Sequence, residues 1–424
     1  MKRRNILIAF LLGSLGLYGC SMEADESTAV TEQTVSQTEE DTVSYSRSEE
    51  YEAQQLEEDA VIEGGAYLAE ETDESALAVG STAEVSVTGA LLKKTDGDAS
   101  SADASSFQGV NAAVRAYDQA VLTLTDCVIE AEAENATGVF AYDGSTIYIS
   151  DSTVNVSGGG AGGIQVAGGG TLYATDLVVN SASKAAVRSD RGGGLLVVEG
   201  GTYTSTGKNG CPAVYSTADI RISEAELVSE NSRAVIIEGK NSVYLEDCSL
   251  SGNDQSTKEG SVRANVLLYQ SASGDASEGT SRFTMKGGEI VSQSGAMFYC
   301  TNTAAVIDLQ EAELVLSEDG TLLIVSAGRW GKDGKNGGDC VLNAVDQTLA
   351  GDILVDSISS LQLDLSGSSY TGAISGEGEV AVTLEEGSSW TLTGDSYITS
   401  FSGDPSSINT NGCALYVNGS VFSA

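Results

Sequence analysis

The sequence predicts an all-β fold, a right-handed, single-stranded parallel β-helix that forms a three-sided β-solenoid. A strand-and-turn pattern returns every 23 to 25 residues along the middle of the chain, and this period is typical of solenoid coils. Only two of the 424 residues are proline, which leaves most backbone N–H groups able to join β ladders. The segments between strands are rich in Gly, Ser, Asn and Asp, which tolerate tight turns. Residues 81–398 have room for roughly a dozen coils at this period.

The first strand of each repeat alternates apolar and polar residues and ends, in all but one copy, at an acidic residue or a glycine. Its copies are Leu122–Asp126, Ile147–Asp151, Leu172–Asp176, Leu196–Gly200, Ile220–Glu224, Val243–Asp247, Phe283–Gly287 and Val306–Gln310. A second short strand follows at once. The acidic residues that end these strands, here called the acidic column, could suggest catalysis or a metal site. The same position also accepts Gly200, Gly287 and Gln310, so we interpret it as a strand-to-strand corner where the side chain accepts turn N–H bonds.

A third strand completes each repeat. Its copies are Gly138–Ala141, Gly163–Val166, Ala186–Ser189, Ala213–Ser216, Ala234–Ile237, Asn265–Tyr269 and Met297–Cys300. Three strands in each coil predict three stacked parallel sheets about 4.8 Å apart from strand to strand. Right-handed crossovers dominate parallel β structure, and this sets the predicted hand.

The N-terminal region predicts export and a lipid anchor. Residues 1–19 form a signal peptide, with a basic start and an apolar run over 6–17. The stretch Leu17–Cys20 resembles the bacterial lipobox, which implies cleavage before Cys20 and its diacylation. The alternative is an ordinary secretory signal. Residues 20–60 are predicted to be the lipidated Cys20 and an acidic, disordered tether, and residues 61–424 the β-helix with terminal caps. The expected location is extracytoplasmic, on a bacterial cell surface and anchored to the lipid bilayer.

Composition excludes several classes of function. The 21 basic and 61 acidic residues give a net charge of −40, which excludes a nucleic-acid partner. The chain has no histidine, so Ser-His-Asp catalysis, Cys-His catalysis and histidine-based zinc sites are absent. Of the seven cysteines, the six beyond Cys20 are interpreted as small buried residues. Disulfides remain an alternative in an exported chain.

The third strand predicts a binding face. Residues that follow its inward-pointing positions should point outward, and they mix aromatic, basic and acidic side chains suited to sugars. The candidates along the strand are Arg115, Phe140, Tyr142, Arg188, Asp190, Tyr215, Glu238, Tyr269 and Tyr299, and nearby turns add Arg191 and Lys240. Trp330, in the glycine-rich loop 328–338, is a further candidate as a contact tip. The alternatives are ordinary solvated strand residues and a simple coil insertion.

Several stretches resemble repetitive surface lipoproteins of anaerobic, mostly Firmicutes, bacteria. They are Gly109–Val114, Arg188–Gly194, Pro212–Tyr215, Glu238–Ser242, Tyr269–Ser271, Phe298–Asn302, Gly351–Ser359 and Trp390–Asp395. The resemblance implies a pectin-lyase-like right-handed β-helix and an adhesin-like role. A more distant similarity is to clostridial β-helix proteins that bind polygalacturonate or cellulose without cleaving it.

These observations predict a non-catalytic adhesin-like or carbohydrate-binding surface protein without a cofactor. Its partner would be a polysaccharide or a host-surface glycan or protein. Two alternatives stay open. One is a Ca²⁺-dependent polysaccharide lyase with an Arg or Lys base, which would make calcium a cofactor. The other is a structural surface spacer with no specific ligand.

Overall fold

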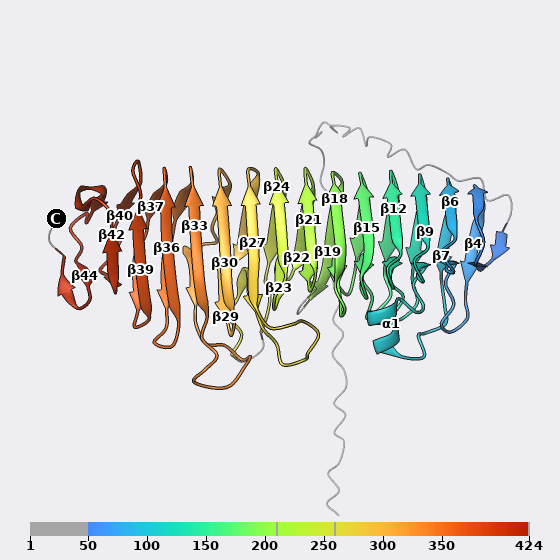
Figure 1. Cartoon of the computed structure of the whole chain (residues 1–424), viewed down its shortest axis with the longest axis horizontal. Coiled ribbons are helices and arrows are strands. Elements are labelled where there is room, and N and C mark those ends of the chain that lie inside the picture. Colours follow the sequence, from blue (N-terminus) through green and yellow to red (C-terminus); the bar gives the residue numbers. More distant parts are fainter. Residues whose placement is uncertain (1–49, 209–210, 258–259, 423–424) are drawn as a thin grey trace, which may run out of the picture. The chain divides into compact units, whose positions relative to one another are not determined.

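A computed structural model describes residues 50–208, 211–257 and 260–422. These residues form a right-handed, three-sided parallel β-helix, which confirms the predicted fold class. Successive coils stack along one axis (Figure 1), and equivalent strands of neighbouring coils pair in parallel. The largest sheet has 14 strands, one for each coil.

That 14-stranded sheet, here sheet C, is built from the predicted first strands. Residues alternate between the interior and the outer face: in the strand Thr146–Ser150, Ile147 and Ile149 are buried, whereas Tyr148 is exposed. Its strands are β3 (Ala60–Glu63), β6 (Glu84–Thr88), β9 (Val121–Thr125), β12 (Thr146–Ser150), β15 (Gly170–Thr175), β18 (Gly194–Glu199), β21 (Asp219–Ser223), β24 (Ser242–Glu246), β27 (Thr280–Lys286), β30 (Ala304–Gln310), β33 (Asp339–Val345), β36 (Ser360–Ser366), β39 (Glu379–Leu384) and β42 (Ser400–Ser402).

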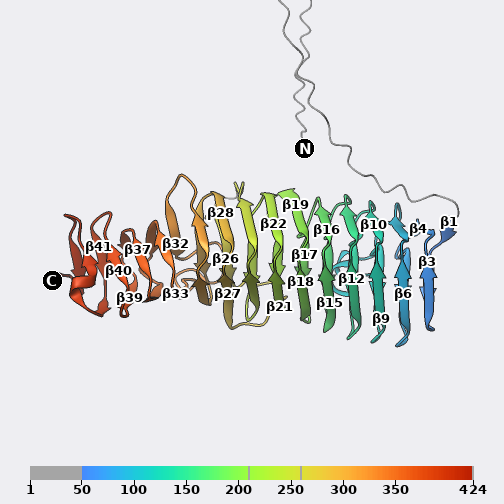
Figure 2. The ribbon, with the colours of Figure 1, turned by 90° about the horizontal axis from the view of Figure 1, so that it is seen from above.

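Sheet A is built from the predicted second strands and has 11 members. They are β1 (Glu50–Glu52), β4 (Ala66–Ala69), β7 (Leu91–Lys94), β10 (Val128–Ala131), β13 (Thr153–Val156), β16 (Val178–Ser181), β19 (Thr202–Lys208), β22 (Glu226–Asn231), β25 (Ser249–Asn253), β28 (Glu289–Ser294) and β31 (Glu313–Val315). A four-stranded sheet follows on the same side of the coil: β34 (Thr348–Ala350), β37 (Ser369–Thr371), β40 (Ser389–Thr391) and β43 (Ile408–Asn409). Figure 2 shows sheets C and A on opposite sides of the stack.

Sheet B is built from the predicted third strands and has 13 members. They are β2 (Gln54–Leu56), β5 (Leu77–Val79), β8 (Val114–Ala116), β11 (Val139–Ala141), β14 (Ile164–Val166), β17 (Val187–Ser189), β20 (Val214–Ser216), β23 (Val235–Glu238), β26 (Ala264–Tyr269), β29 (Ala296–Thr301), β32 (Thr321–Val325), β35 (Asp352–Val355) and β38 (Ile374–Gly376). The strands β41 (Ser396–Ile398), β44 (Leu415–Val417) and β45 (Ser420–Val421) form a last small sheet, in which β45 is antiparallel to β44. A short 3₁₀ helix, η1 (Pro405–Ser407), precedes β43.

The acidic column lies at the corner between sheets C and A, as predicted. Its residues adopt the left-handed conformation, for example φ 51° at Asp151 and 52° at Asp176, and Gly200 takes the same role at φ 68°. Glycine and aspartate are among the residues that adopt this conformation most readily. The placement of Gln310 in this column is wrong, because Gln310 ends β30 and pairs with Lys286. Glu311, with φ 52°, occupies the corner instead.

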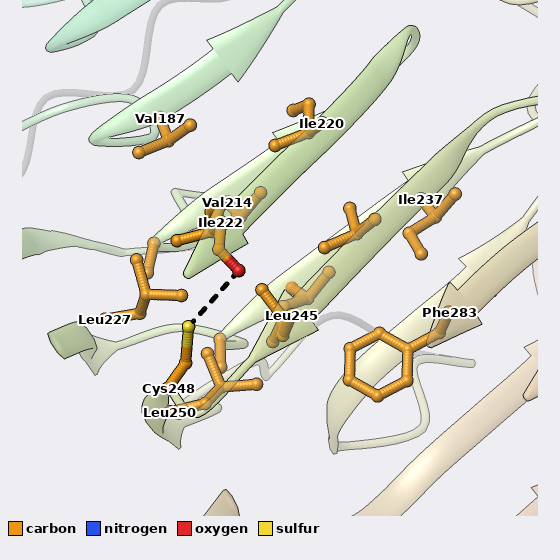
Figure 3. Close-up of a cluster of buried hydrophobic side chains, with 14 of the residues drawn as sticks. Val187, Val214, Ile220, Ile222, Leu227, Ile237, Leu245, Cys248, Leu250 and Phe283 are labelled. Atoms are coloured by element: carbon orange, nitrogen blue, oxygen red, sulfur yellow. Dashed lines mark hydrogen bonds between the residues drawn. The ribbon is translucent and has the colours of Figure 1, made fainter. Parts of the chain in front are cut away.

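The interior is an apolar column shared by all three sheets. In Figure 3, Val187, Val214 and Ile237 from sheet B meet Ile222 and Leu245 from sheet C, and all five are buried. Each buried Val, Leu or Ile contributes about 1.5–3 kcal/mol relative to an exposed one. The six cysteines beyond Cys20 are free, and four of them are buried. The thiol of buried Cys248 donates to the carbonyl of Ile222 at 3.5 Å, as the dashed line in Figure 3 marks.

The first coil begins earlier than predicted. Strands β1 and β2 lie within residues 50–56, which the sequence assigned to the disordered tether. Tyr51 stacks on Tyr67 of the next coil with ring centroids 5.2 Å apart, and Leu56 packs against the core. These contacts offset the chain entropy that the composition suggested would prevail. The predicted signal peptide 1–19, Cys20 and tether residues up to 49 lie outside the described residues. In the described part of the chain, no helix is long and apolar enough to cross a membrane.

Long connections gather along one side of the stack. The helix α1 (Ala102–Gln108) lies between β7 and β8, and loops follow β25, β26 and β32. Figure 1 shows α1 and the long loops extending from the same edge of the β-helix. Ser101 caps α1 by accepting a hydrogen bond from the N–H of Ala104, and Gly109 ends it in the left-handed conformation.

Candidate functional site

The outer face of sheet B is covered at its N-terminal end by α1. Gln165 donates to the carbonyl of Ser106 at 2.8 Å, and Lys184 donates to the hydroxyl of Ser106 at 2.8 Å. The ring of Phe140 is fully buried and packs with Ala112 and Ala167. Contacts from three successive coils therefore hold this part of the cover down.

A polar cluster lies farther along the same face. The carboxylate of Glu238 accepts hydrogen bonds from the hydroxyls of Tyr215, Tyr269 and Ser271, with 2.9 Å from Tyr269. Glu238 is only 1% exposed. A buried carboxylate is tolerated when donors replace its lost water, and these three hydroxyls supply them. Ser271 belongs to the loop after β26, so the cluster ties that loop to the sheet.

Charged pairs attach the covering segments to one another. Arg188 pairs with Asp190 at 2.6 Å and lies 4.5 Å from the ring centroid of Tyr215. Arg191 pairs with Asp275 of the loop after β26 and lies over the ring of Phe107 in α1, 4.1 Å from its centroid. Arg191 therefore bridges two covers that are far apart in the sequence.

The loops after β25 and β32 extend the cover toward the C-terminal coils. Arg233 pairs with Asp254 at 3.0 Å and donates to the carbonyl of Val262 at 2.6 Å. Trp330 packs against Tyr269 with ring centroids 5.2 Å apart. The hypothesis of a projecting contact tip at Trp330 is therefore wrong, because the ring is partly buried against the sheet B face.

Burial raises the pKa of Tyr215 well above its ordinary value of 10, and Tyr269 and Glu238 add to the effect. Burial also raises the pKa of Tyr269, followed by the charge of Glu238. Both phenols consequently keep their protons and act as donors to Glu238. Burial, and next the charge of Arg188, lower the pKa of Lys184 from 10.5 to about 8. The hydrogen bonds of Tyr215, Tyr269 and Ser271 to Glu238 therefore hold the loop after β26 against sheet B.

The predicted side chains thus lie on the outer side of sheet B, as expected, but α1 and the long loops cover much of that face. The side chains of Phe140, Asp190, Glu238, Tyr269 and Tyr299 are buried, which contradicts their assignment as surface ligand contacts. The side chains of Arg115, Tyr142, Arg188, Tyr215 and Trp330 are partly buried, and those of Arg191 and Lys240 are exposed. The signal for the cover was present in the long segments 95–113 and 254–279 and in the loop 328–338, but the period alone does not show where they fold.

An open groove runs beside the cover, along the corner between sheets B and C. Three adjoining hollows form it, with volumes of about 780, 340 and 470 Å³. The first two share Glu278, Gly279 and Thr280, and the last two share Thr280 and Ala304. Together they extend from the start of β18 to β42, nine strands of sheet C. At about 4.8 Å for each coil the groove is about 40 Å long.

The lining of the groove changes along its length. Lys240 and Arg282 line the first hollow, together with Asn241, Asp219 and Glu278. The third hollow is lined mainly by small or apolar residues, among them Ala304, Val306, Val341, Val380 and Ala381, with Gln362 and the acidic Asp339 and Glu379 beside them. Of the sequence-predicted site residues, Lys240 alone lines a hollow of the described groove.

Tyrosines continue from the cationic end of the groove across sheet C. Tyr148 and Tyr173 stack with ring centroids 5.1 Å apart and planes 8° apart. Tyr244 lies in the same column and donates to Glu246 at 3.0 Å. Because stacking occupies one face of Tyr148 and of Tyr173, these two rings offer hydroxyls and edges rather than two open faces.

Within the described ranges, no group of three or more carboxylate or thiol side chains is arranged to hold a metal ion. Comparisons of the chain with protein-family models, with curated proteins and with solved structures find no match.

Proposed function

We propose that this protein is a non-catalytic, surface-held β-helix that binds an extended polysaccharide in the groove between sheets B and C. The observation that carries the proposal is the groove of adjoining hollows along nine coils. A chain of sugars lying along the axis would meet a new set of side chains at every coil. Small apolar residues suit the apolar faces of sugar rings, and Asn, Thr, Gln and charged residues supply hydrogen bonds to hydroxyls.

The surface location is part of the same proposal. The lipobox-like stretch ending at Cys20 supports acylation of that cysteine, and a diacyl anchor holds a protein firmly to a bilayer. A binding groove on a lipid-anchored β-helix would attach the cell to a glycan. Metabolic labelling with a fatty acid tests the anchor: label should enter the wild-type chain and be absent from the Cys20→Ala variant.

A glycan-array screen of the full chain tests the groove, with Ala304→Trp as the blocking variant. Ala304 is exposed where the second and third hollows meet, so an indole there should fill the groove. Ala182→Trp, at an exposed position outside the groove, is the matched control. Binding should be lost in Ala304→Trp alone. Unchanged binding by both variants would show that the groove is not the site.

The lyase alternative retains a distinct signature. Lys240 and Arg282 lie in the groove and are residue types that can act as the base of such an enzyme. Release of unsaturated uronide products, abolished by EDTA, would replace the non-catalytic proposal with the lyase. Silence in binding and turnover, with altered cell-surface properties on deletion, would favour the structural spacer.

A further inference from the structure

We propose that the Lys240 and Arg282 end of the groove selects a polyanionic glycan, one that carries carboxylate or sulfate groups on its sugars. This inference rests on the proposed function and names the ligand class of the same groove. Its chemistry comes from four exposed cations on three consecutive coils: Arg221 in β21, Lys240 just before β24, and Arg282 and Lys286 in β27. They stand out in a chain with 21 basic residues against 61 acidic ones.

Two of these cations, Lys240 and Arg282, have no side-chain partner among the described residues. Arg221 pairs with Asp219 at 2.7 Å, and Lys286 lies 5.6 Å from the ring centroid of Tyr244. Among the described residues, neither Lys240 nor Arg282 has an ion pair or side-chain hydrogen bond. Their backbones are adjacent, because the N–H of Arg282 donates to the carbonyl of Asn241 at 2.9 Å. Both side chains line the hollow of about 780 Å³.

The acids near this hollow differ in how far they are neutralised. Asp219 is already committed, since it pairs with Arg221 and accepts from Ser242 at 2.6 Å. Glu278 remains as the acid that opposes an anionic ligand in the lining. An Arg guanidinium and a Lys ammonium are the groups that bind carboxylate and sulfate most strongly, so their location here favours an anionic partner.

The adjoining hollow provides contacts for the uncharged part of the ligand. Gln270 lines it and is 8% exposed, and its Oε1 has no donor among the described residues. This oxygen is itself buried, so a sugar would meet the other residues of the hollow instead. Asn302 and Thr303 line the same hollow. The groove thus places anion-binding groups at one end and hydroxyl-binding groups next to it.

The net charge of −40 opposes a polyanion at long range. At physiological ionic strength, however, charges farther away than about 8 Å are largely screened. The local cations then decide the affinity. This balance predicts an unusual salt response: affinity should rise between very low and physiological salt and fall at higher salt, as the local ion pairs themselves become screened.

Titration calorimetry of the full chain tests the inference with three probes. Hyaluronan oligosaccharides carry carboxylates, chondroitin sulfate oligosaccharides carry carboxylates and sulfates, and dextran is neutral. We expect both anionic probes to bind and dextran to bind much more weakly. Binding of chondroitin sulfate alone would identify sulfate as the recognised group. The variant Arg282→Gln/Lys240→Gln should weaken binding about tenfold, as expected for two exposed ion pairs.

Charge-matched variants separate local recognition from net charge. Lys208→Gln/Lys335→Gln removes two exposed cations outside the groove and should leave affinity unchanged. Arg282→Lys/Lys240→Arg should retain binding, and Glu278→Gln should strengthen it. Equal binding of dextran and hyaluronan, unaffected by Arg282→Gln/Lys240→Gln but lost in Ala304→Trp, would overturn the anionic selectivity and keep the groove. No binding of any glycan would overturn both.

Discussion

At the scale of single residues, Tyr203 and Tyr215 show how the same side chain takes different roles. Tyr203 lies in the apolar interior with no exposed area, and its hydroxyl has no hydrogen-bond partner among the described residues. Tyr215 lies outside the interior, and its hydroxyl donates to Glu238. Burying an unpaired hydroxyl destabilises the folded state, whereas a hydrogen bond to a charged group stabilises it.

Substitution of these tyrosines by phenylalanine should therefore have opposite effects at neutral pH. Tyr203→Phe should leave the free energy of unfolding unchanged or raise it by up to about 1 kcal/mol, and Tyr215→Phe should lower it by about 1.5–3 kcal/mol. Urea unfolding followed by circular dichroism measures both. A clear loss of stability in Tyr203→Phe would mean that its hydroxyl has a partner.

Tyr203 also predicts how stability responds to alkaline pH. Burial, and next the charge of Asp176, raise the pKa of Tyr203 above its ordinary value of 10. A raised folded pKa means that the stability contribution is complete below pH 10 and is lost as the pH rises from 10 toward the folded value. The unfolding free energy should fall there by about 1.4 kcal/mol per pH unit for each such tyrosine. Tyr203→Phe should have a shallower decline than wild type in urea titrations above pH 10, and parallel declines would contradict the assignment.

At the scale of elements, β11 separates the interior from the cover within two adjacent residues. Val139 points into the apolar column, whereas Phe140 lies in the separate cluster beneath α1. The strand's period of two makes this division. The cover was not predicted, because a short capped helix in a Ser- and Ala-rich segment carries no apolar stripe that shows where it docks.

Alanine substitution at these two positions should separate local from global stability. Phe140→Ala should speed amide hydrogen exchange in residues 102–113 with a smaller change in the global unfolding midpoint. Val139→Ala should lower the global free energy of unfolding by about 1–3 kcal/mol. It should not speed amide exchange selectively in α1. Hydrogen exchange with mass spectrometry measures both. Uniform protection of α1 in Phe140→Ala would show that the helix is held without the ring.

At the scale of the whole molecule, the repeat predicted the fold because every coil has to meet the same physical requirements. An apolar alternation fills the interior, and a corner residue must tolerate positive φ, as Asp126 and Gly287 do. The binding site was less predictable. The face around Arg188 and Tyr215 was identified from alternation, but its cover depends on contacts between segments as distant as Arg191 and Asp275. The groove arises from the shape of a corner, which a one-dimensional pattern does not record.

The ends of the stack lack the neighbour that every internal coil has, so the terminal strands need protection from pairing with other molecules. At the C-terminal end, β42 and β43 cover β39 and β40, and the antiparallel β45 closes the last sheet. The net charge of −40 adds mutual repulsion between molecules. Geometry and charge are therefore two separate barriers to association.

Deletion of residues 396–424 should separate these two barriers. It uncovers β39 and β40 while removing a single charged side chain, Asp404. The truncated chain should stay monomeric at low salt, where repulsion extends about 30 Å at 0.01 M, and associate at 1 M, where it extends about 3 Å. Light scattering coupled to size-exclusion chromatography measures the mass, with the full chain at the same salt concentrations as control. A truncated chain that stays monomeric at high salt would show that the exposed strand edges are protected without this segment, because charge is the barrier that salt removes.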